Sequence, residues 1–238
     1  MGTFMITYRI KYGEGLVYVI ALEIDANTLD FLSPVPGICP DWTSLEYEKC
    51  PNCPLSNGAC ANCPLAEKIS LLTDISEQLL SYDEIMVEVE TPDRTVVKQT
   101  TAQKAFSSLM GLLIPISGCP LTCFLRPMVR FHLPFASEEE TIYRSTSMYL
   151  LAQYYRLLNG EQPDFELEGL KQHYHNLHHI NRCLANRMRG KTSKDSSINA
   201  LVILDLFTSS VPMVIDDTLQ DIRYLFAPYL VPQEGSAS

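Results

Sequence analysis

Cysteines are the residues in this sequence whose type and spacing are best suited to chemistry. Residues 50–65 read CPNCPLSNGACANCPL, in which the pattern C-x-N-C-P-L occurs twice, ten residues apart. A C-x2-C pair directs two sulfurs at one ion, and two pairs supply the four thiolates that tetrahedral zinc favours. Asn57-Gly58 between the pairs is a strong turn signal that folds one pair back on the other. The repeat therefore predicts a metal site with the ligands Cys50, Cys53, Cys60 and Cys63.

The spacing between these cysteines favours zinc and leaves two alternatives open. The two pairs in C-x2-C-x6-C-x2-C are closer together than in the usual zinc ribbon. Four thiolates also hold a single iron or an iron–sulfur cluster, although the ferredoxin run C-x2-C-x2-C is missing. A closed four-cysteine zinc site usually stabilises a fold and leaves no open position for catalysis. We expect structural zinc, with iron or an iron–sulfur cluster, or no metal at all, as the alternatives.

A second candidate for chemistry is the mostly apolar run SGCPLTCFLRPMVRFHLPF, residues 117–135. Cys119 and Cys123, with His132 as the base, would form a redox or nucleophilic site. Free thiols in an apolar connector more often behave as small buried groups. We favour the second interpretation, and keep Cys119, Cys123 and His132 as the candidate catalytic residues.

Histidines gather in HYHNLHHINR, residues 173–182. His175 and His179 are four residues apart on one helical face, a spacing that can chelate zinc, but the motif H-E-x-x-H is absent. We expect both to be surface histidines. His173 and Asn181 fall on the apolar face instead, where polar side chains satisfy buried hydrogen bonds.

Charge and hydropathy exclude two classes of partner. The formal net charge is −10, so the overall field repels nucleic-acid backbones and anionic lipid surfaces. Residues 105–125 carry no charge, but Pro115 and Pro120 would leave backbone groups unsatisfied in lipid, which favours a buried helix and turn over a membrane span. No secretory leader is recognised, so we expect the cytoplasm, where cysteines serve as thiols and metal ligands. A protein partner is the expected kind of partner.

Two predicted hairpins give the first part of the chain a sheet. Residues 4–12 and 16–24 are rich in Ile, Val and Tyr on either side of a Gly-containing turn, and residues 84–90 alternate as EIMVEVE before the turn TPDR and the run TVVKQT. A four-stranded antiparallel sheet is the simplest assembly of the two hairpins. The cysteine-rich insertion, residues 33–82 approximately, would then project from this sheet.

From residue 101 the hydrophobic period becomes helical. Ser137 and Glu140 form a capping box for a helix that runs to about Leu158, and a second helix starts near Asp164. Asp195-Ser196-Ser197 would cap a third helix that ends before Pro212, and Asp216-Asp217 a fourth that runs through Phe226. The prediction is an α+β protein, with the sheet and its insertion in residues 1–100 and a helical bundle in residues 101–232, packed together as one module.

Several phrases of the sequence together resemble a known protein family. DWTSLEYEKCPNCPL, VEVETPDRTVVKQT, FLRPMVRFHLPF and SMYLLAQYYR are similar to a family of bacterial proteins known only as a domain of unknown function. The resemblance runs from Tyr8 to about Phe226 and implies a bacterial, cytoplasmic, single-module protein without implying any activity. It also implies that Cys50, Cys53 and Cys63 match the family pattern better than Cys60.

The expected function follows from the cysteine repeat. We expect a non-enzymatic metal-binding protein, in which zinc stabilises a scaffold that contacts another protein or senses metal or redox state. The alternative is an iron or iron–sulfur redox protein, or a thiol-dependent enzyme that uses Cys119, Cys123 and His132.

Overall fold

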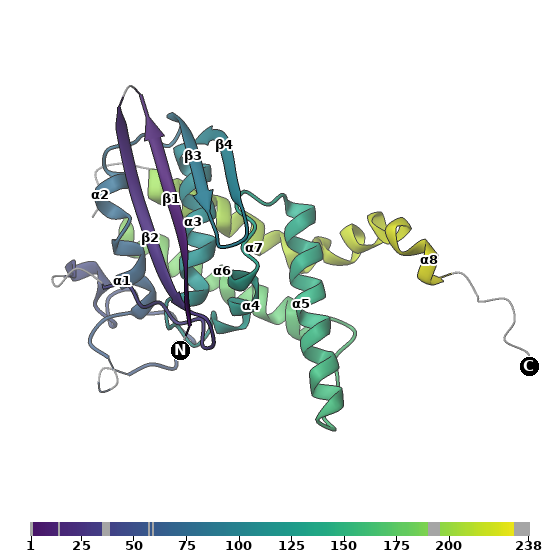
Figure 1. Cartoon of the computed structure of the whole chain (residues 1–238). Helices are drawn as coiled ribbons and strands as arrows, with labels where there is room; N and C mark the ends of the chain where they lie inside the picture. Colours follow the sequence, from purple (N-terminus) through teal and green to yellow (C-terminus); the bar gives the residue numbers. More distant parts are fainter. Residues whose placement is uncertain are drawn as a thin grey trace, which may run out of the picture.

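A four-stranded antiparallel sheet forms one side of the molecule. The structure is a computed structural model that describes residues 2–13, 15–34, 39–56, 58, 60–189 and 196–230. The strands are β1 (Thr3–Tyr12), β2 (Leu16–Asp25), β3 (Glu84–Glu90) and β4 (Thr95–Thr101), in the order β2-β1-β3-β4 (Figure 1). The predicted α+β class and the sheet made of two hairpins are confirmed.

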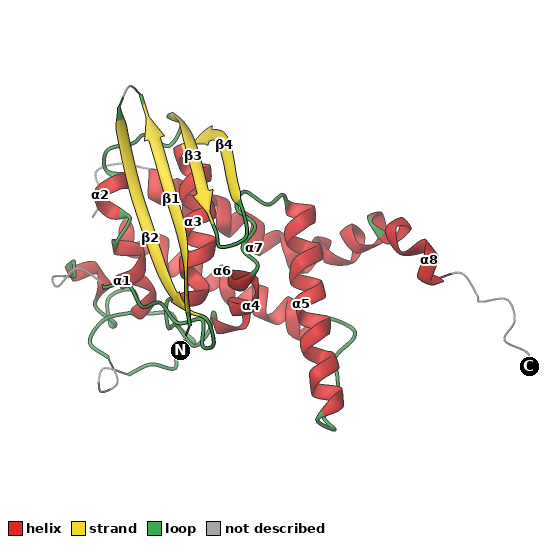
Figure 2. Ribbon diagram, viewed as in Figure 1, coloured by secondary structure: helices red, strands yellow, loops and turns green. Residues whose placement is uncertain are grey.

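The sheet has one buried and one open face because its strands alternate. Ile6, Tyr8 and Ile10 of β1 are buried, and the register pairs Tyr8 with Val89 and Ile10 with Val87 of β3. The residues between them face outward, where Arg9 lies opposite Glu88. Figure 2 shows the helices gathered behind the sheet, with the other face open.

Helix α3 (Ala102–Ile116) covers the inner face of the sheet. It begins directly after β4, contacts β3 and β4, and buries ten of its residues, including Phe106 and Leu109. The chain turns after it at Gly118, whose φ of 88° is accessible to glycine at no steric cost. The uncharged run is therefore a buried helix and turn, as predicted. No helix in the described part of the chain is long and apolar enough to cross a membrane.

The remaining helices lie mostly behind α3. Helix α7 contacts α3, α5 and α6, and so joins the helical layer together. The bounds are η1 (Asp41–Thr43), α1 (Pro64–Ser70), α2 (Thr73–Ser76), η2 (Cys123–Leu125), α4 (Arg126–Arg130), α5 (Glu138–Leu158), α6 (Glu168–Met188), α7 (Ser196–Asp221), η3 (Arg223–Phe226) and α8 (Ala227–Leu230).

Helix α5 begins as predicted and then leaves the body of the molecule. The Ser137 hydroxyl accepts from Glu140 N at 3.1 Å, and the Glu140 carboxylate accepts from Ser137 N at 2.7 Å, which completes the capping box. The helix ends at Leu158, before Gly160 with a φ of 78°. Its far end projects downward in Figure 1.

The two later helices differ from the sequence prediction. Helix α6 begins at Glu168, because the Asp164 carboxylate, which was expected to start it, accepts from Gly169 N and from the Tyr149 hydroxyl, each at 2.8 Å. Helix α7 continues through Pro212, so the prediction that it ends there was wrong. Its apolar side is buried on both sides of the proline, at Val211 and Ile215, and this burial outweighs the lost hydrogen bond.

The end of α7 also differs from the prediction. Asp216-Asp217 lies inside α7 and does not start a helix. The chain continues into the short elements η3 and α8. Asp195 lies outside the described residues.

Candidate metal centre

The two ends of the cysteine segment, defined here as residues 39–63, lie side by side, while Asn57 of the predicted turn lies outside the described residues. Cys53 N donates to Cys50 O at 3.0 Å, which closes the first turn, and Leu45 N donates to Ala61 O at 2.9 Å. Cys63 N donates to Thr43 O at 2.7 Å, and Pro64 is the first residue of α1, as predicted. The two C-x2-C pairs are thus brought to the same part of the molecule.

Arg187 of α6 holds this segment against the helical layer. Its Nη1 donates to Ser44 O at 2.6 Å and to Trp42 O at 3.1 Å, and its Nη2 donates to Leu45 O at 3.1 Å. Only 2% of the residue is exposed. A buried guanidinium is tolerated where such acceptors satisfy its donors, so these carbonyls and Arg187 depend on one another.

Cys183 is a thiol of this site that sequence reasoning missed. It lies one turn before Arg187 on α6, and its thiol is close enough to the Cys50 thiol to raise the pKa of Cys50. The signal is present in the sequence: Asn176, Ile180, Cys183 and Arg187 have the 4-3-4 spacing of a second helical stripe beside the apolar one. Asn176 also faces the segment, because its Oδ1 accepts from Asn52 Nδ2 at 3.3 Å.

Cys119 reaches the same place from a third part of the chain. Gly118 packs against the start of α1, since a Cβ built on it would lie 3.8 Å from Pro64 Cβ. Burial raises the pKa of the Cys119 thiol to about 11, and the neighbouring thiols Cys63 and Cys53 contribute to the rise. The cysteine group therefore combines three distant stretches of sequence, and we define it as Cys50, Cys53, Cys60, Cys63, Cys119 and Cys183.

The thiols of the cysteine group disfavour one another's charged forms. Burial raises the pKa of Cys50, and Cys183, Cys63 and Cys119 raise it further. All of the group are free thiols. A divalent cation reverses this balance, because it binds thiolates and releases their protons. The donor type and its burial therefore suit a thiophilic metal ion.

Cys60 is half-buried, as are Cys50, Cys53, Cys63 and Cys183. Burial raises its pKa, followed by the effects of Cys63 and Cys53, and the ammonium of Lys49 partly offsets the rise. Cys50 and Cys63 pack against the apolar core, whereas Cys60 is not among the residues that do so. In the described part of the chain no three His, Cys, Asp or Glu side chains have the spacing of metal ligands, so coordination requires local movement of the thiols.

The second candidate trio is not one site in the structure. His132 Nε2 lies 2.7 Å from the Tyr8 hydroxyl, and burial lowers the pKa of His132 to about 3, with Arg144 as a smaller cause. Cys123 is exposed and donates to Pro120 O at 3.1 Å, while Cys119 belongs to the cysteine group. The imidazole thus pairs with a phenol from the sheet rather than with either thiol.

The histidines of α6 are distributed much as their positions predict. His175 and His179 lie on one exposed face with their Nε2 atoms 3.1 Å apart. His178 Nδ1 lies 2.7 Å from an Asp205 carboxylate oxygen, and His173 stacks on Phe124 with ring centroids 4.3 Å apart. Asn181 is buried, as expected, and its Nδ2 donates to the Thr208 hydroxyl at 3.2 Å.

Comparison with known proteins gives one match. Neither a curated protein nor a solved structure matches the chain. The model of a family described as Domain of unknown function (DUF6901) matches residues 6–227, which is most of the chain. The resemblance expected from the sequence motifs is thereby borne out at the level of a domain of unknown function, and the chain belongs to the DUF6901 family.

Proposed function

We propose that the protein binds one metal ion, zinc, through the cysteine group, and that it acts as a non-enzymatic scaffold. The observation that carries the proposal is the contact between Cys50 of the repeat and Cys183 of α6. A thiol from a distant helix thus lies beside the repeat, where we propose that it serves as the fourth ligand. Closed four-thiolate zinc sites stabilise the segments that supply their ligands.

The ligand set that we propose is Cys50, Cys53, Cys63 and Cys183. Three of these belong to the repeat, and Cys183 takes the position that the repeat alone would give to Cys60. Cys60 lies toward Lys49, whose pKa is raised by its hydrogen bond to Glu46 and, to a smaller extent, by the charges of Cys53 and Cys60. This ammonium can remain the partner of Cys60, outside the metal site.

The proposed role of the metal is to fix the cysteine segment to α6. Without it the segment is held mainly by Arg187 and by its own turns. A segment held in this way changes its stability with metal or thiol oxidation, which suits sensing or reversible contact with another protein. A reducing compartment such as the cytoplasm would keep the thiols available.

Metal analysis combined with two matched variants tests the proposal. Protein purified without air should be colourless and contain about one zinc per chain. Cys183→Ser should lose the metal and lower the denaturant midpoint, whereas Cys60→Ser should keep both. Equal retention of zinc by the two variants would remove Cys183 from the ligand set, and metal-free wild-type protein that binds no added zinc would overturn the proposal itself.

An iron–sulfur centre is the second candidate, because four thiolates of the group could hold a cluster as well as zinc, with Cys119 near Cys63 and Cys53 as a further possible ligand. Coloured protein with sulfur-to-iron charge-transfer bands would favour it. In that case Cys119→Ser should change the spectrum, whereas for the zinc site it should leave the metal content unchanged.

A further inference from the structure

A cavity separate from the cysteine group lies where the end of the sheet meets the helices. Its volume is about 470 Å³, within the range of about 300–1,000 Å³ typical of small-molecule sites. Its walls come from β4, α3, η2, α4, α5, α6 and α7 and from the loop between α4 and α5. Most of the lining is apolar, including Ile114, Met128 and Leu177, and the polar lining groups are described below.

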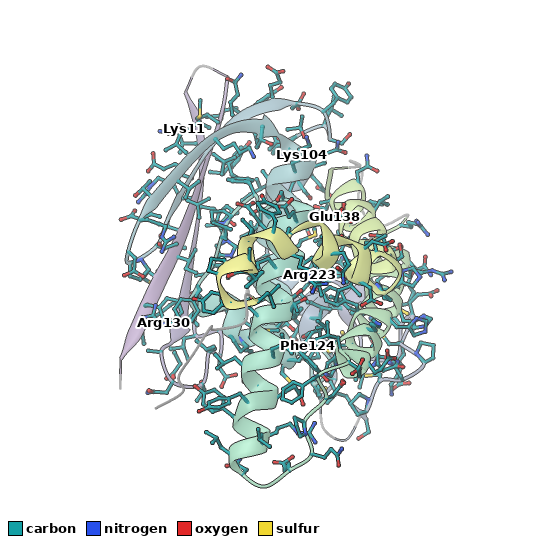
Figure 3. The ribbon with its side chains drawn as sticks, turned by 90° about the vertical axis from the view of Figure 1, so that its right-hand side faces the viewer. Lys11, Lys104, Phe124, Arg130, Glu138 and Arg223 are labelled. Carbon is teal, nitrogen blue, oxygen red and sulfur yellow. The ribbon has the colours of Figure 1, made fainter. Side chains whose placement is uncertain are left out.

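The outer part of the cavity is cationic although the whole chain is acidic. Lys98, Lys104 and Arg144 line it, against one carboxylate, that of Glu138. Figure 3 shows Lys104 and Glu138 near one another on the side that faces the viewer. None of the three cations forms an ion pair within the described residues. This local excess of positive charge suits an anion.

Arg144 is the cation best placed to bind a ligand group. It is half-buried, and its described hydrogen bonds leave from one nitrogen: Nη2 donates to Phe131 O at 2.7 Å and to Met128 O at 3.3 Å. Burial lowers the pKa of Arg144, partly offset by the more distant Glu140, so the guanidinium lacks a full counter-charge. A guanidinium fork matches a carboxylate in two parallel hydrogen bonds.

The side chain of Asn181 lines another part of the cavity wall and also lines a second, smaller cavity. Asn181 is 1% exposed, and its Oδ1 has no hydrogen-bond partner in the described structure. The amide orientation is consistent with its neighbours, because the Thr208 hydroxyl donates to Asp205 O and therefore accepts from Asn181 Nδ2. A buried unpaired acceptor is costly and calls for a donor from a ligand or a water molecule.

Two further polar groups of the wall, Ser108 and His132, already have hydrogen-bond partners and add no charge. The Tyr8 hydroxyl lies 2.7 Å from His132 Nε2 and 3.0 Å from the Ser108 hydroxyl, which also accepts from Phe135 N at 3.1 Å. His132 stays neutral above its pKa of about 3. The cavity therefore has two groups that a ligand could satisfy: the Arg144 guanidinium, which lacks a full counter-charge, and Asn181 Oδ1, which lacks a hydrogen-bond donor. Apolar side chains separate the two.

Gly111 explains how the space is kept open. It lies in the middle of α3 and lines the cavity, and a Cβ built on it would have no heavy atom within 4 Å. Glycine inside a helix costs about 1 kcal/mol relative to alanine, and no backbone geometry or close packing requires it here. The missing side chain at this position leaves room for a ligand.

We propose that this cavity binds an organic monocarboxylate with an apolar chain that carries a hydroxyl group. The carboxylate pairs with Arg144 and Lys104, the chain lies along the apolar wall, and the hydroxyl donates to Asn181 Oδ1. A monoanion fits better than a phosphate dianion, because Glu138 reduces the positive charge at the mouth and the lining offers no glycine-rich loop of backbone N–H groups.

Calorimetric titration of the full chain with decanoate bearing a terminal hydroxyl tests the proposal. It should bind, plain decanoate should bind about tenfold more weakly because Asn181 stays unpaired, and decanol, acetate and inorganic phosphate should bind far more weakly than either. Failure of both decanoates to bind would mean that the cavity holds only water. Equal binding of the two acids would remove Asn181 from the site, and tighter binding of phosphate would overturn the choice of ligand.

Three variants locate the binding. Gly111→Leu should fill the cavity and abolish binding while leaving the protein folded, because leucine is a better helix former than glycine. Lys104→Gln should weaken binding about fivefold to tenfold and reduce its dependence on salt. The matched control is Lys11→Gln, which should bind the ligand as the wild type does. Lys11 lies on the open face of the sheet, away from Lys104 in Figure 3. Unchanged binding by folded Gly111→Leu would overturn the proposal.

Discussion

The sheet and the cysteine segment are positioned by opposite means. The sheet is held by apolar side chains that alternate along its strands, such as Ile6, Ile10 and Val87, and by hydrogen bonds between neighbouring strands. In its described residues the cysteine segment has one short 3-10 helix, η1, and its backbone is held by its own turns and by Arg187 from α6. The position of the sheet follows from the pattern of its own strands, whereas the position of the cysteine segment depends on a residue that is distant in the sequence.

This difference makes the two regions sensitive to different changes. Apolar burial is spread over many residues, so a single substitution in the sheet removes a part of it. Three carbonyls of the segment share the guanidinium of Arg187, and losing it leaves all three unpaired at once. The experiments below test this contrast, from the largest expected effect to the smallest.

Removing Arg187 should cause the largest loss of stability. Arg187→Met keeps most of the apolar stem but leaves the carbonyls of Trp42, Ser44 and Leu45 without their donors. We expect the free energy of unfolding to fall by about 3–5 kcal/mol, measured by denaturant unfolding. Arg182→Met, on the exposed side of the same helix, is the control and should change it by less than about 0.5 kcal/mol. Similar losses in both would show that α6, not the segment, is being tested.

Acid should destabilise the region around the sheet through His132. Its folded pKa of about 3 lies below the ordinary value of 6.5, so the unfolded chain binds a proton that the folded one does not. Stability should therefore fall as the pH drops from about 6.5 toward 3, by up to about 1.4 kcal/mol per pH unit. His132→Gln should lose about 2 kcal/mol less than the wild type between pH 6.5 and 4.5 in denaturant unfolding. An identical pH dependence in the two proteins would contradict a buried neutral imidazole.

A local polar contact should matter less than either. Ser137→Ala removes half of the capping box of α5, whose partners are only three residues apart. The expected loss in the free energy of unfolding is about 1 kcal/mol. Ser147→Ala, exposed within the same helix, should leave it unchanged or slightly higher. A loss as large as that of Arg187→Met would mean that the start of α5 organises more than its own helix.

The smallest effect is expected on the open face of the sheet. Arg9 pairs with Glu88 at 3.0 Å and with Glu90 at 2.7 Å, and all three side chains are in contact with solvent. Exposed pairs of this kind contribute little and are screened by salt. Arg9→Gln should leave the denaturant midpoint within experimental error at physiological salt. A shift comparable to that of Ser137→Ala would show that this face is shielded from solvent.

Features encoded within a few residues could be predicted from the sequence. The alternation of EIMVEVE, the turns that join the strands, the capping box at Ser137 and the helix start at Pro64 all depend on neighbours in the chain. Pro212 misled the prediction because the rule that proline ends a helix is also local, and burial of α7 on both sides of it outweighs that rule.

Features that depend on distant residues could not be predicted. The repeat identified four members of the cysteine group. Cys183 and Arg187 reach the segment only when α6 packs against residues 42–45, so their roles could not be predicted. The cavity could not be predicted for the same reason, because its walls come from seven elements of the fold and one loop, and no short motif describes it. Asn181 could be assigned to the apolar face, but its unpaired oxygen is visible only in three dimensions.

The distance in sequence between Arg187 and its partners determines which part of the site is synthesised first. Its carbonyl partners precede it by 142, 143 and 145 residues. At roughly 5–20 residues per second, the ribosome exposes those carbonyls and the neighbouring thiols for about seven to thirty seconds before Arg187 is added. The cysteine repeat is therefore exposed to cellular metal ions and oxidants before α6, with Cys183 and Arg187, has been synthesised. The first ion or oxidant to reach the repeat acts on a chain that has not yet folded around it.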